Sequence, residues 1–243
     1  SKQNSYFHLK QSMPQLIVLF AASWLLVWLI EKQHLSVLGL RPNTERIKYF
    51  VILFLAAATC STAAFLLRML LVKESYMLSP SLNVRAVVTE IGYQIRTVLT
   101  EELLFRGVLL YILIKKLGVK KAIVISSVAF ALMHWMNAGV WGNITQMATV
   151  FLFTFFMGLV LAFAYAKTYS LFLPFAIHFG WNLVQNYIFP GMTGSNAVFV
   201  LAANPPVVTI SYAAFFTMLL LPKIAVLVTS YFIMRQHLQV ATP

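Results

Sequence analysis

The 243-residue sequence contains no aspartate and only six acidic residues, all of them glutamate, against eighteen lysines and arginines. Charged residues make up 10% of the chain and hydrophobic residues 60%, whereas a soluble globular protein has about 25% charged and roughly 45–50% apolar residues. So few polar side chains cannot cover the surface of a protein that folds in water. The composition therefore predicts an integral membrane protein.

Several catalytic arrangements are excluded by the same shortage of residues. Without aspartate there is no Ser-His-Asp triad in its usual form, and no Gly-x-Ser-x-Gly nucleophile motif occurs. Neither His134 nor His178 belongs to a His-Glu-x-x-His pattern, which excludes the usual zincin helix. The single cysteine, Cys60, lies inside an apolar run, so intrachain disulfides and multi-cysteine metal sites are excluded as well.

Hydrophobic runs recur throughout the chain with only short gaps between them. A bilayer core about 30 Å thick is crossed by roughly 20 apolar residues in a helix. We therefore predict an all-α fold, a polytopic transmembrane helical bundle of about seven spans (six to eight), in one membrane domain over residues 1–243. The apolar piece Ala197–Ala203 either lies at the membrane interface or enters the bilayer as a broken eighth segment. The predicted spans are residues 15–31, 48–72, 88–114, 121–137, 145–167, 171–189 and 207–234.

Lysine and arginine are concentrated in alternate loops, for example over Lys32–Lys48 and Lys115–Lys121, whereas the 138–144 and 190–206 loops contain none. The positive-inside rule then places the C-terminus in the cytoplasm and the N-terminus outside. A pI near 10.0 is also typical of nucleic-acid-binding proteins. Because the basic residues lie in short loop clusters between apolar runs, we predict contact with the lipid bilayer and no nucleic-acid partner.

The densest group of charges inside a predicted span is Thr100-Glu101-Glu102-Leu103-Leu104-Phe105-Arg106. Each ionisable group near the bilayer centre costs at least ~2.5–3.5 kcal/mol, so it needs a partner or a function. On an α-helix, Glu102 and Arg106 lie about 40° apart around the axis, whereas Glu101 and Arg106 are separated by about 140°. We predict an internal ion pair between Glu102 and Arg106, with Glu101 facing elsewhere as a carboxylate available for chemistry.

Polar side chains form a stripe on each of three predicted spans. Together the stripes predict a polar, water-lined cavity within the bundle. The alternative is that Glu90 lies at the membrane interface, that Gln94 and Thr97 hydrogen-bond to neighbouring helices, and that each histidine only packs there. The stripes are Glu90, Gln94, Thr97 and Glu101 on the third span, Ser127, Phe130, His134 and Asn137 on the fourth, and His178, Asn182, Gln185 and Asn186 on the sixth.

These spans together offer a carboxylate, two imidazoles and a side-chain amide. Such a set can activate a water molecule, bind a metal ion and donate hydrogen bonds to a developing oxyanion. Hydrolysis of an amide bond uses all of these capacities. The residues themselves therefore favour a hydrolytic site, with or without a metal.

Three motifs follow one another along the chain: Glu101-Glu102-x-x-x-Arg106, Phe130-x-x-x-His134 and His178-x-x-x-Asn182. Taken together they resemble the CPBP family, the CAAX-processing and bacteriocin-processing (Abi) intramembrane proteases. The resemblance covers chiefly residues 98–186 and implies a catalytic core over about 88–190. The short, highly apolar chain with compact loops looks like a bacterial member, which implies the bacterial cell membrane as its location.

The resemblance implies a role for each motif residue. Glu101 would act as general base on a water molecule, assisted by His134, while Glu102 and Arg106 would hold the site. His178 and Asn182 would stabilise the tetrahedral oxyanion. The implied reaction is endoproteolysis of a peptide or protein substrate, and one alternative is that this substrate is membrane-associated. The substrates of the family are prenylated C-terminal peptides in eukaryotes and leader or signalling peptides in bacteria.

The cofactor and two other functions stay open. The family is described both as metalloproteases and as metal-free enzymes, so the implied cofactor is either none or zinc. Glu101, His134 and His178 would leave one place for water on a tetrahedral zinc ion. The chain could instead be a catalytically silent membrane scaffold or regulator of the same fold, or an ion or proton carrier that uses buried Glu, His and Arg.

A few residues outside the motifs have structural interpretations. Arg68 and Lys223 lie inside apolar runs, where snorkelling or a helix break explains them, and Pro222 favours a kink beside Lys223. Trp135 and Trp181 each neighbour a motif histidine, so they either anchor at the interface or line a substrate groove.

Overall fold

The computed structural model describes residues 18, 20–30, 32–190 and 197–237. These residues form two compact units. The first unit contains the described residues of Ser1–Ile47, Arg96–Phe175 and Met234–Pro243, and the second contains those of Lys48–Ile95 and Ala176–Ile233. The predicted motifs are divided between them, with Glu101 to His134 in the first unit and His178 and Asn182 in the second.

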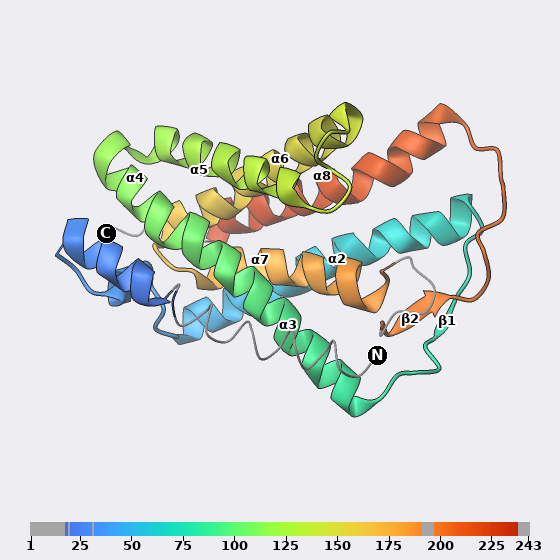
Figure 1. The fold of residues 1–243 in the computed structure, drawn as a ribbon, viewed down its shortest axis with the longest axis horizontal. Helices are drawn as coiled ribbons and strands as arrows, with labels where there is room; N and C mark the ends of the chain where they lie inside the picture. The colour runs from blue at the N-terminus through green and yellow to red at the C-terminus, as the bar shows by residue number, and fades with distance from the viewer. Residues whose placement is uncertain (1–17, 19, 31, 191–196, 238–243) are drawn as a thin grey trace. The chain divides into compact units, whose positions relative to one another are not determined.

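The first unit is built around α5 (Val119–Met133) and α6 (Ile144–Thr168), which lie side by side (Figure 1). Gly158 of α6 allows their close approach, because a Cβ there would stand 3.0 Å from the Cβ of Ser127 on α5. The buried core of this unit includes Leu38, Leu103 and Tyr165. Its other elements are the helix Phe20–Ile30, η1 (Leu35–Leu38), the end of α3 (Val84–Glu102), the π-helix η2 (Leu103–Leu109), α4 (Leu110–Leu117) and the 3-10 helix η3 (His134–Met136).

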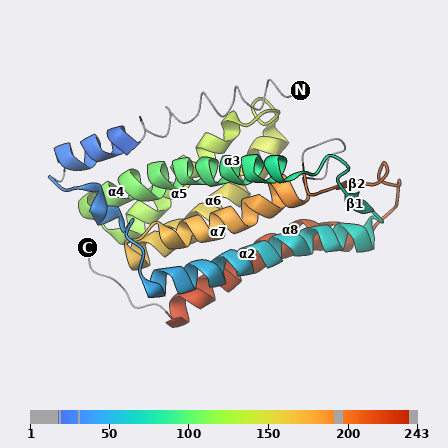
Figure 2. The same cartoon turned by 90° about the horizontal axis from the view of Figure 1, so that it is seen from below.

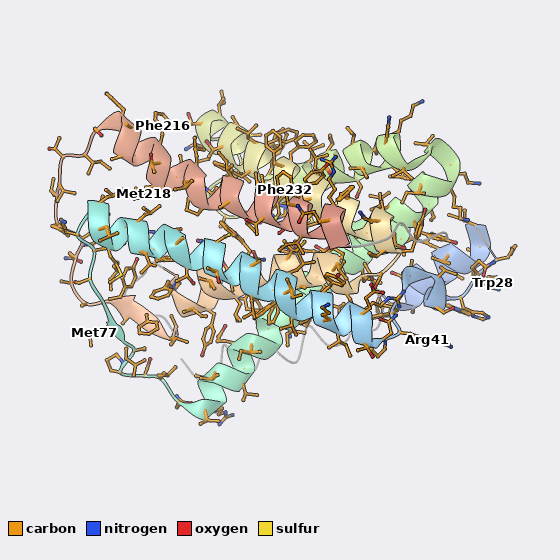
Figure 3. All side chains as sticks on the ribbon, turned by 180° about the vertical axis from the view of Figure 1, so that it is seen from behind. Trp28, Arg41, Met77, Phe216, Met218 and Phe232 are labelled. Carbon is orange, nitrogen blue, oxygen red and sulfur yellow. The ribbon has the colours of Figure 1, made fainter. Side chains whose placement is uncertain are left out.

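The second unit combines α2 (Thr44–Leu71) with α8 (Tyr212–His237), whose long axes run alongside each other in Figures 2 and 3. It also contains most of α3 and of α7 (Phe172–Leu183), which continues into the π-helix η4 (Val184–Ile188). A short antiparallel pair joins β1 (Tyr76–Leu78) to β2 (Phe199–Leu201). Aromatic rings stacked or packed edge to face support this pair: Phe65 of α2 and Phe189, which follows η4, contact Tyr76 of β1, and Phe189 also stacks on Phe199 of β2.

Four helices begin at a side chain that caps their first turn. The side-chain oxygen of Asn43 accepts a hydrogen bond from the backbone N–H of Arg46 at 2.8 Å at the start of α2. Asn83, Asn143 and Ser211 do the same for α3, α6 and α8. Because such a cap satisfies an N–H that has no partner inside the helix, it fixes where each helix starts. Three of the four helices, α2, α3 and α8, therefore begin four or five residues away from the start of the predicted span.

The helical membrane bundle predicted from the sequence is confirmed. Each of the seven predicted spans contains helix among its described residues, although residues 15–17, 19 and 31 of the first span lie outside them; the third span corresponds to α3, η2 and α4. Four helices are long and apolar enough to cross a membrane by length and composition: Thr44–Leu71, Val119–Met136, Ile144–Thr168 and Tyr212–Gln236. Among the charged residues of α3 are Arg85, Glu90 and Arg96, which lower its hydropathy. That residues 1–243 form a single domain stays a prediction.

The segment Ala197–Ala203 does not form the broken eighth span that was one of its two alternatives. Its residues Phe199–Leu201 form β2, in which Met77 of β1 stands opposite Val200. A position of this segment at the membrane interface stays a prediction. Strand pairing satisfies the backbone N–H and C=O groups of an apolar segment that is too short to do so as a membrane helix.

Large apolar side chains remain exposed on the helices that are long enough to cross a bilayer. On α8, Phe216 is 51% exposed and Phe232 is 47% exposed, one towards each end of the helix (Figure 3). A water-soluble protein rarely leaves such large apolar areas uncovered. Contact with lipid accounts for them.

We expect Gly39→Ala to destabilise the first unit. Gly39 has a φ of 65°, and a Cβ there would collide with the backbone carbonyl oxygen of Tyr169. The left-handed backbone costs about 1–2 kcal/mol for alanine, and the collision adds roughly 1–3 kcal/mol. Gly139→Ala is the matched control, because Gly139 has a φ of 79° with open space around it. Thermal unfolding in detergent should show a clearly lower midpoint for the Gly39 variant, and equal midpoints would contradict this packing.

Candidate active site

The first motif lies where an α-helix changes into a π-helix. Glu101 and Glu102 end α3, and Arg106 lies within η2, where the N–H of Leu110 donates to the carbonyl of Phe105 five residues earlier. The hydroxyl of Ser126 on α5 donates a second hydrogen bond to the same carbonyl at 2.9 Å. Single π turns inside α-helices are rare and occur frequently at functional sites. The neighbouring helix thus helps to hold this irregular turn in place.

Glu102 and Arg106 form the predicted ion pair, with the Nη1 of Arg106 3.1 Å from Oε1 of Glu102 and both side chains fully buried. The guanidinium also lies over the ring of Phe130, 3.9 Å from its centroid, which is a cation–π contact. Arg106 therefore connects the first motif to the second.

Glu101 and His134 face each other in the first unit. Nδ1 of His134 lies 2.8 Å from the backbone carbonyl of Phe130. Because a carbonyl only accepts, this contact places the proton on Nδ1 and leaves Nε2 of the neutral ring as an acceptor. Nε2 is 4.0 Å from Oε2 of Glu101, and the two side chains are 16% and 18% exposed. The gap is too long for a direct hydrogen bond and suits a bridging water molecule.

The third motif forms its own pair in the second unit. Nδ2 of Asn182 donates to Nε2 of His178 at 3.0 Å, and His178 is buried with 4% exposure. An amide NH₂ group only donates, so the proton of a neutral His178 lies on Nδ1.

Other polar residues of the predicted stripes bond to neighbouring helices. Nδ2 of Asn186 donates to Oε1 of Gln94 on α3 at 3.4 Å, and Nε2 of Gln185 donates to the hydroxyl of Ser61 on α2 at 3.1 Å. For Gln94 the alternative of an interhelical hydrogen bond is therefore confirmed. Gln185 and Asn186 lie in η4, whose wider turn rotates them away from the α-helical positions assumed for the stripe.

The structure contains only part of the stripe predicted on the fourth span. Phe130 and His134 pack edge to face, with ring centroids 4.5 Å apart. Asn137 lies after the end of η3 with an extended backbone and an exposed side chain, so it does not continue the row. The hydroxyl of Ser127 donates to the carbonyl of Ile123 in its own helix. The indole of Trp135 donates to the carbonyl of Met147 at 2.9 Å and so ties η3 to α6.

The structure thus brings the predicted residues together in two groups. Glu101, Glu102, Arg106, Phe130 and His134 form one group in the first unit, and His178 and Asn182 form the other in the second. That the two groups surround one water molecule stays a prediction. Within either unit, the described residues contain no set of three His, Cys or acidic side chains that could hold a metal ion. The Nε2 atom of His178 is moreover occupied by the amide of Asn182.

Comparison with known protein families finds one matching family model, described as Rce1-like, type II CAAX prenyl endopeptidase, over residues 83–184. The match includes all three motifs and ends just after Asn182. It confirms the family resemblance predicted from those motifs. Comparison with curated proteins and with solved structures gives no match.

Glu102→Gln should destabilise the protein by about 3–5 kcal/mol, because it leaves the buried guanidinium of Arg106 without its charged partner. The double variant Glu102→Gln/Arg106→Met removes both charges and should cost less than the sum of the two single changes. Glu45→Gln changes an exposed glutamate in the same way and serves as the control. Unfolding midpoints and yields of folded protein in detergent measure these effects. Additive single and double effects would contradict a coupled buried pair.

Proposed function

Since residues 83–184 belong to the CPBP family of CAAX endopeptidases, we propose that the protein is an intramembrane endopeptidase that hydrolyses a peptide bond with a water molecule activated between Glu101 and His134. The single observation that supports this mechanism is the facing pair of acceptors, Oε2 of Glu101 and Nε2 of His134, 4.0 Å apart. A water molecule between them can donate one hydrogen bond to each. Two acceptors on one water molecule increase the electron density of its oxygen.

In the first chemical step Glu101 takes a proton from this water molecule while its oxygen attacks the scissile carbonyl carbon. The carbonyl oxygen becomes an oxyanion, which receives hydrogen bonds from His178 and Asn182. The tetrahedral intermediate then collapses, the C–N bond breaks, and the proton held by Glu101 is delivered to the leaving amine. His134 orients the water molecule throughout, because its Nδ1 is fixed to the Phe130 carbonyl.

Glu102 and Arg106 act as positioning residues in this proposal. Their ion pair is fully buried, and the guanidinium also packs on Phe130. Phe130 in turn contacts the ring of His134 and provides the carbonyl that fixes its tautomer. The pair therefore holds both Glu101 and His134 through covalent neighbours and one shared aromatic ring.

The proposal contains no metal step. Glu101 and His134 provide only two metal-ligating side chains. Nε2 of His178, the third predicted ligand, accepts a hydrogen bond from Asn182. The described residues of each unit do not assemble a three-ligand site. The Glu and His side chains already supply a base and an oriented water molecule.

The substrate in this proposal is a peptide or protein that reaches the site from the membrane. The four apolar helices and the family match support an integral membrane protein. We propose that the protein lies in a bacterial cell membrane with its C-terminus in the cytoplasm. The family description points to prenylated C-terminal peptides as the first substrates to assay.

Glu101→Gln should lower kcat for cleavage of a prenylated reporter peptide by at least about a hundredfold, because the amide cannot take the proton of the water molecule. The variant should insert and fold normally, as judged by its elution in detergent. Glu45→Gln, the same substitution at an exposed position of α2, should cleave like the parent protein.

If Glu101→Gln cleaved the reporter as fast as the parent protein, Glu101 would not be the general base. A membrane scaffold would instead keep its partner-dependent phenotype without any peptide product, and an ion carrier would lose ion flux in liposomes. The same variant therefore separates the three functions considered for this chain.

Chelation should leave cleavage unchanged, because the proposed water activation uses side chains only. The measurement is cleavage before and after dialysis against 1,10-phenanthroline, together with the metal content of the purified protein and of Glu101→Gln and His134→Ala. One zinc ion per chain, lost in both variants and required for activity, would overturn the metal-free mechanism.

A further inference from the structure

The short antiparallel pair of β1 and β2 adjoins the helices of the second unit (Figure 1). At one end of the pair the N–H of Ser79 donates to the carbonyl of Val198, and at the other end the N–H of Ala202 donates to the carbonyl of Ser75, both at 2.9 Å. Along an antiparallel ladder, residue pairs that exchange hydrogen bonds alternate with pairs that do not. These two contacts therefore fix which residues of β1 bond to β2 and which do not.

The backbone groups of Tyr76 and Leu78 point away from β2. The two residues stand opposite Leu201 and Phe199, at the positions that lie between the hydrogen-bonded pairs of the ladder. Their N–H and C=O groups form the outer edge of β1, and among the described residues no group is hydrogen-bonded to this edge. The outer edge of β1 thus offers two donors and two acceptors to a further strand.

The side chains of β1 are apolar and largely exposed. Met77 is 43% and Leu78 is 57% exposed, whereas Val200 of β2 is 7% exposed. Proteins usually protect an edge strand with charged side chains, proline or a bulge, because an open edge pairs with other extended chains. The strand Tyr76–Leu78 contains neither a charged residue nor a proline. Its chemistry therefore fits an extended, apolar partner.

The side chain of Tyr76 holds β1 in place. Its ring packs edge to face on Phe65 of α2 and on Phe189, which follows η4. Its hydroxyl donates to Oε2 of Glu74 at 2.7 Å, and Nη2 of Arg68 lies 2.7 Å from Oε1 of the same carboxylate. A strand that is fixed in this way loses little conformational freedom when a partner adds to it, which favours binding.

The strand pair lies at the end of the helix that carries the third motif. The carbonyl of Tyr187 in η4 accepts a hydrogen bond from the N–H of Val198, next to β2, at 3.0 Å. Tyr187 follows His178 by nine residues, which corresponds to about 13 Å along a helix. An extended peptide spans this distance with about four residues. A peptide whose scissile carbonyl lies at His178 and Asn182 therefore reaches the strand pair within one short segment.

We propose that the outer edge of β1 binds the substrate as an added β-strand, in which alternate residues of an extended peptide pair with Tyr76 and Leu78. The inference rests on the proposed endopeptidase function and adds how the substrate is recognised. Main-chain hydrogen bonds provide the affinity in this mode of binding, so peptides of different sequence fit the edge. A C-terminal peptide has few residues beyond its scissile bond, and the segment on β1 therefore lies on the N-terminal side of that bond.

The test measures the Kd of a prenylated reporter peptide for the full-length parent protein in nanodiscs. The scissile amide is reduced to CH2–NH, so that the reporter binds without being cleaved. A series of reporters each carries one N-methylated residue, from the third residue before the scissile bond towards the N-terminus. Only every second residue of a strand directs its N–H to the neighbouring strand. Two positions separated by one residue should each raise the Kd by on the order of tenfold, and the residue between them should leave it unchanged.

Leu78→Pro tests the same contact from the side of the protein. Proline removes an N–H at the outer edge of β1 and leaves the ladder to β2 intact, because the N–H of Leu78 is not bonded to β2. The variant should raise the Kd of the unmethylated reporter by on the order of tenfold. Leu78→Ala removes the side chain and keeps the N–H, so it is the matched control and should bind the reporter like the parent protein.

No binding of the unmethylated reporter, no effect of N-methylation at any position, or equal effects at consecutive positions would each overturn the inference, even if Leu78→Pro fails to fold. If Leu78→Pro converts a dimer of the parent protein into a monomer and leaves the Kd unchanged, the edge pairs with a second copy of the chain and the inference is wrong. None of these measurements involves cleavage. Failure of the proposed function, seen as undiminished cleavage by Glu101→Gln, is therefore distinguishable from failure of this inference.

Discussion

The buried pair of Glu102 and Arg106 is the interaction on which the rest of the first unit's site depends. Two opposite charges with no exposure to solvent are tolerated in an apolar interior only if they stay together. Arg106 then packs on Phe130, which offers its carbonyl to His134 and its ring to the same imidazole. In this series of contacts, the placement of each side chain depends on the side chain before it. The pair thereby holds Glu101 and His134 at a fixed separation.

The ion pair shows what sequence reasoning captures and what it misses. A spacing of four residues correctly predicted that Glu102 and not Glu101 would form the hydrogen-bonded partner of Arg106. The same reasoning assumed a regular α-helix, whereas Arg106 lies in a π turn. That turn is supported by a serine hydroxyl from α5, more than twenty positions away, so no local pattern around Arg106 indicates it. The second π-helix, η4, follows His178 and Asn182 and likewise turns Gln185 and Asn186 away from the positions they would have in a regular α-helix.

Hydrophobic length and periodicity were sufficient to predict the helices but not their partners. The described residues of every predicted span contain helix, because a membrane interior leaves few other ways to satisfy the backbone. The strand pair β1–β2 was missed, since it depends on two short segments that lie far apart along the chain. The sequence pattern places Asn137 on the stripe of His134 because it predicts helix up to residue 137, whereas α5 ends at Met133 and η3 at Met136. The hydrogen bond of Gln94 to Asn186 shows that a polar stripe within a membrane can serve packing as well as chemistry.

The anchoring of His134 to a main-chain carbonyl has one more consequence. A ring held in this way cannot turn over and exchange its two nitrogens without breaking a contact within its own helix. The imidazole is therefore directional: one edge is bonded to its own helix, and only the edge that bears Nε2 faces Glu101. In the proposed mechanism this edge can only accept a hydrogen bond, so Glu101 has to carry the proton from the water molecule to the leaving amine.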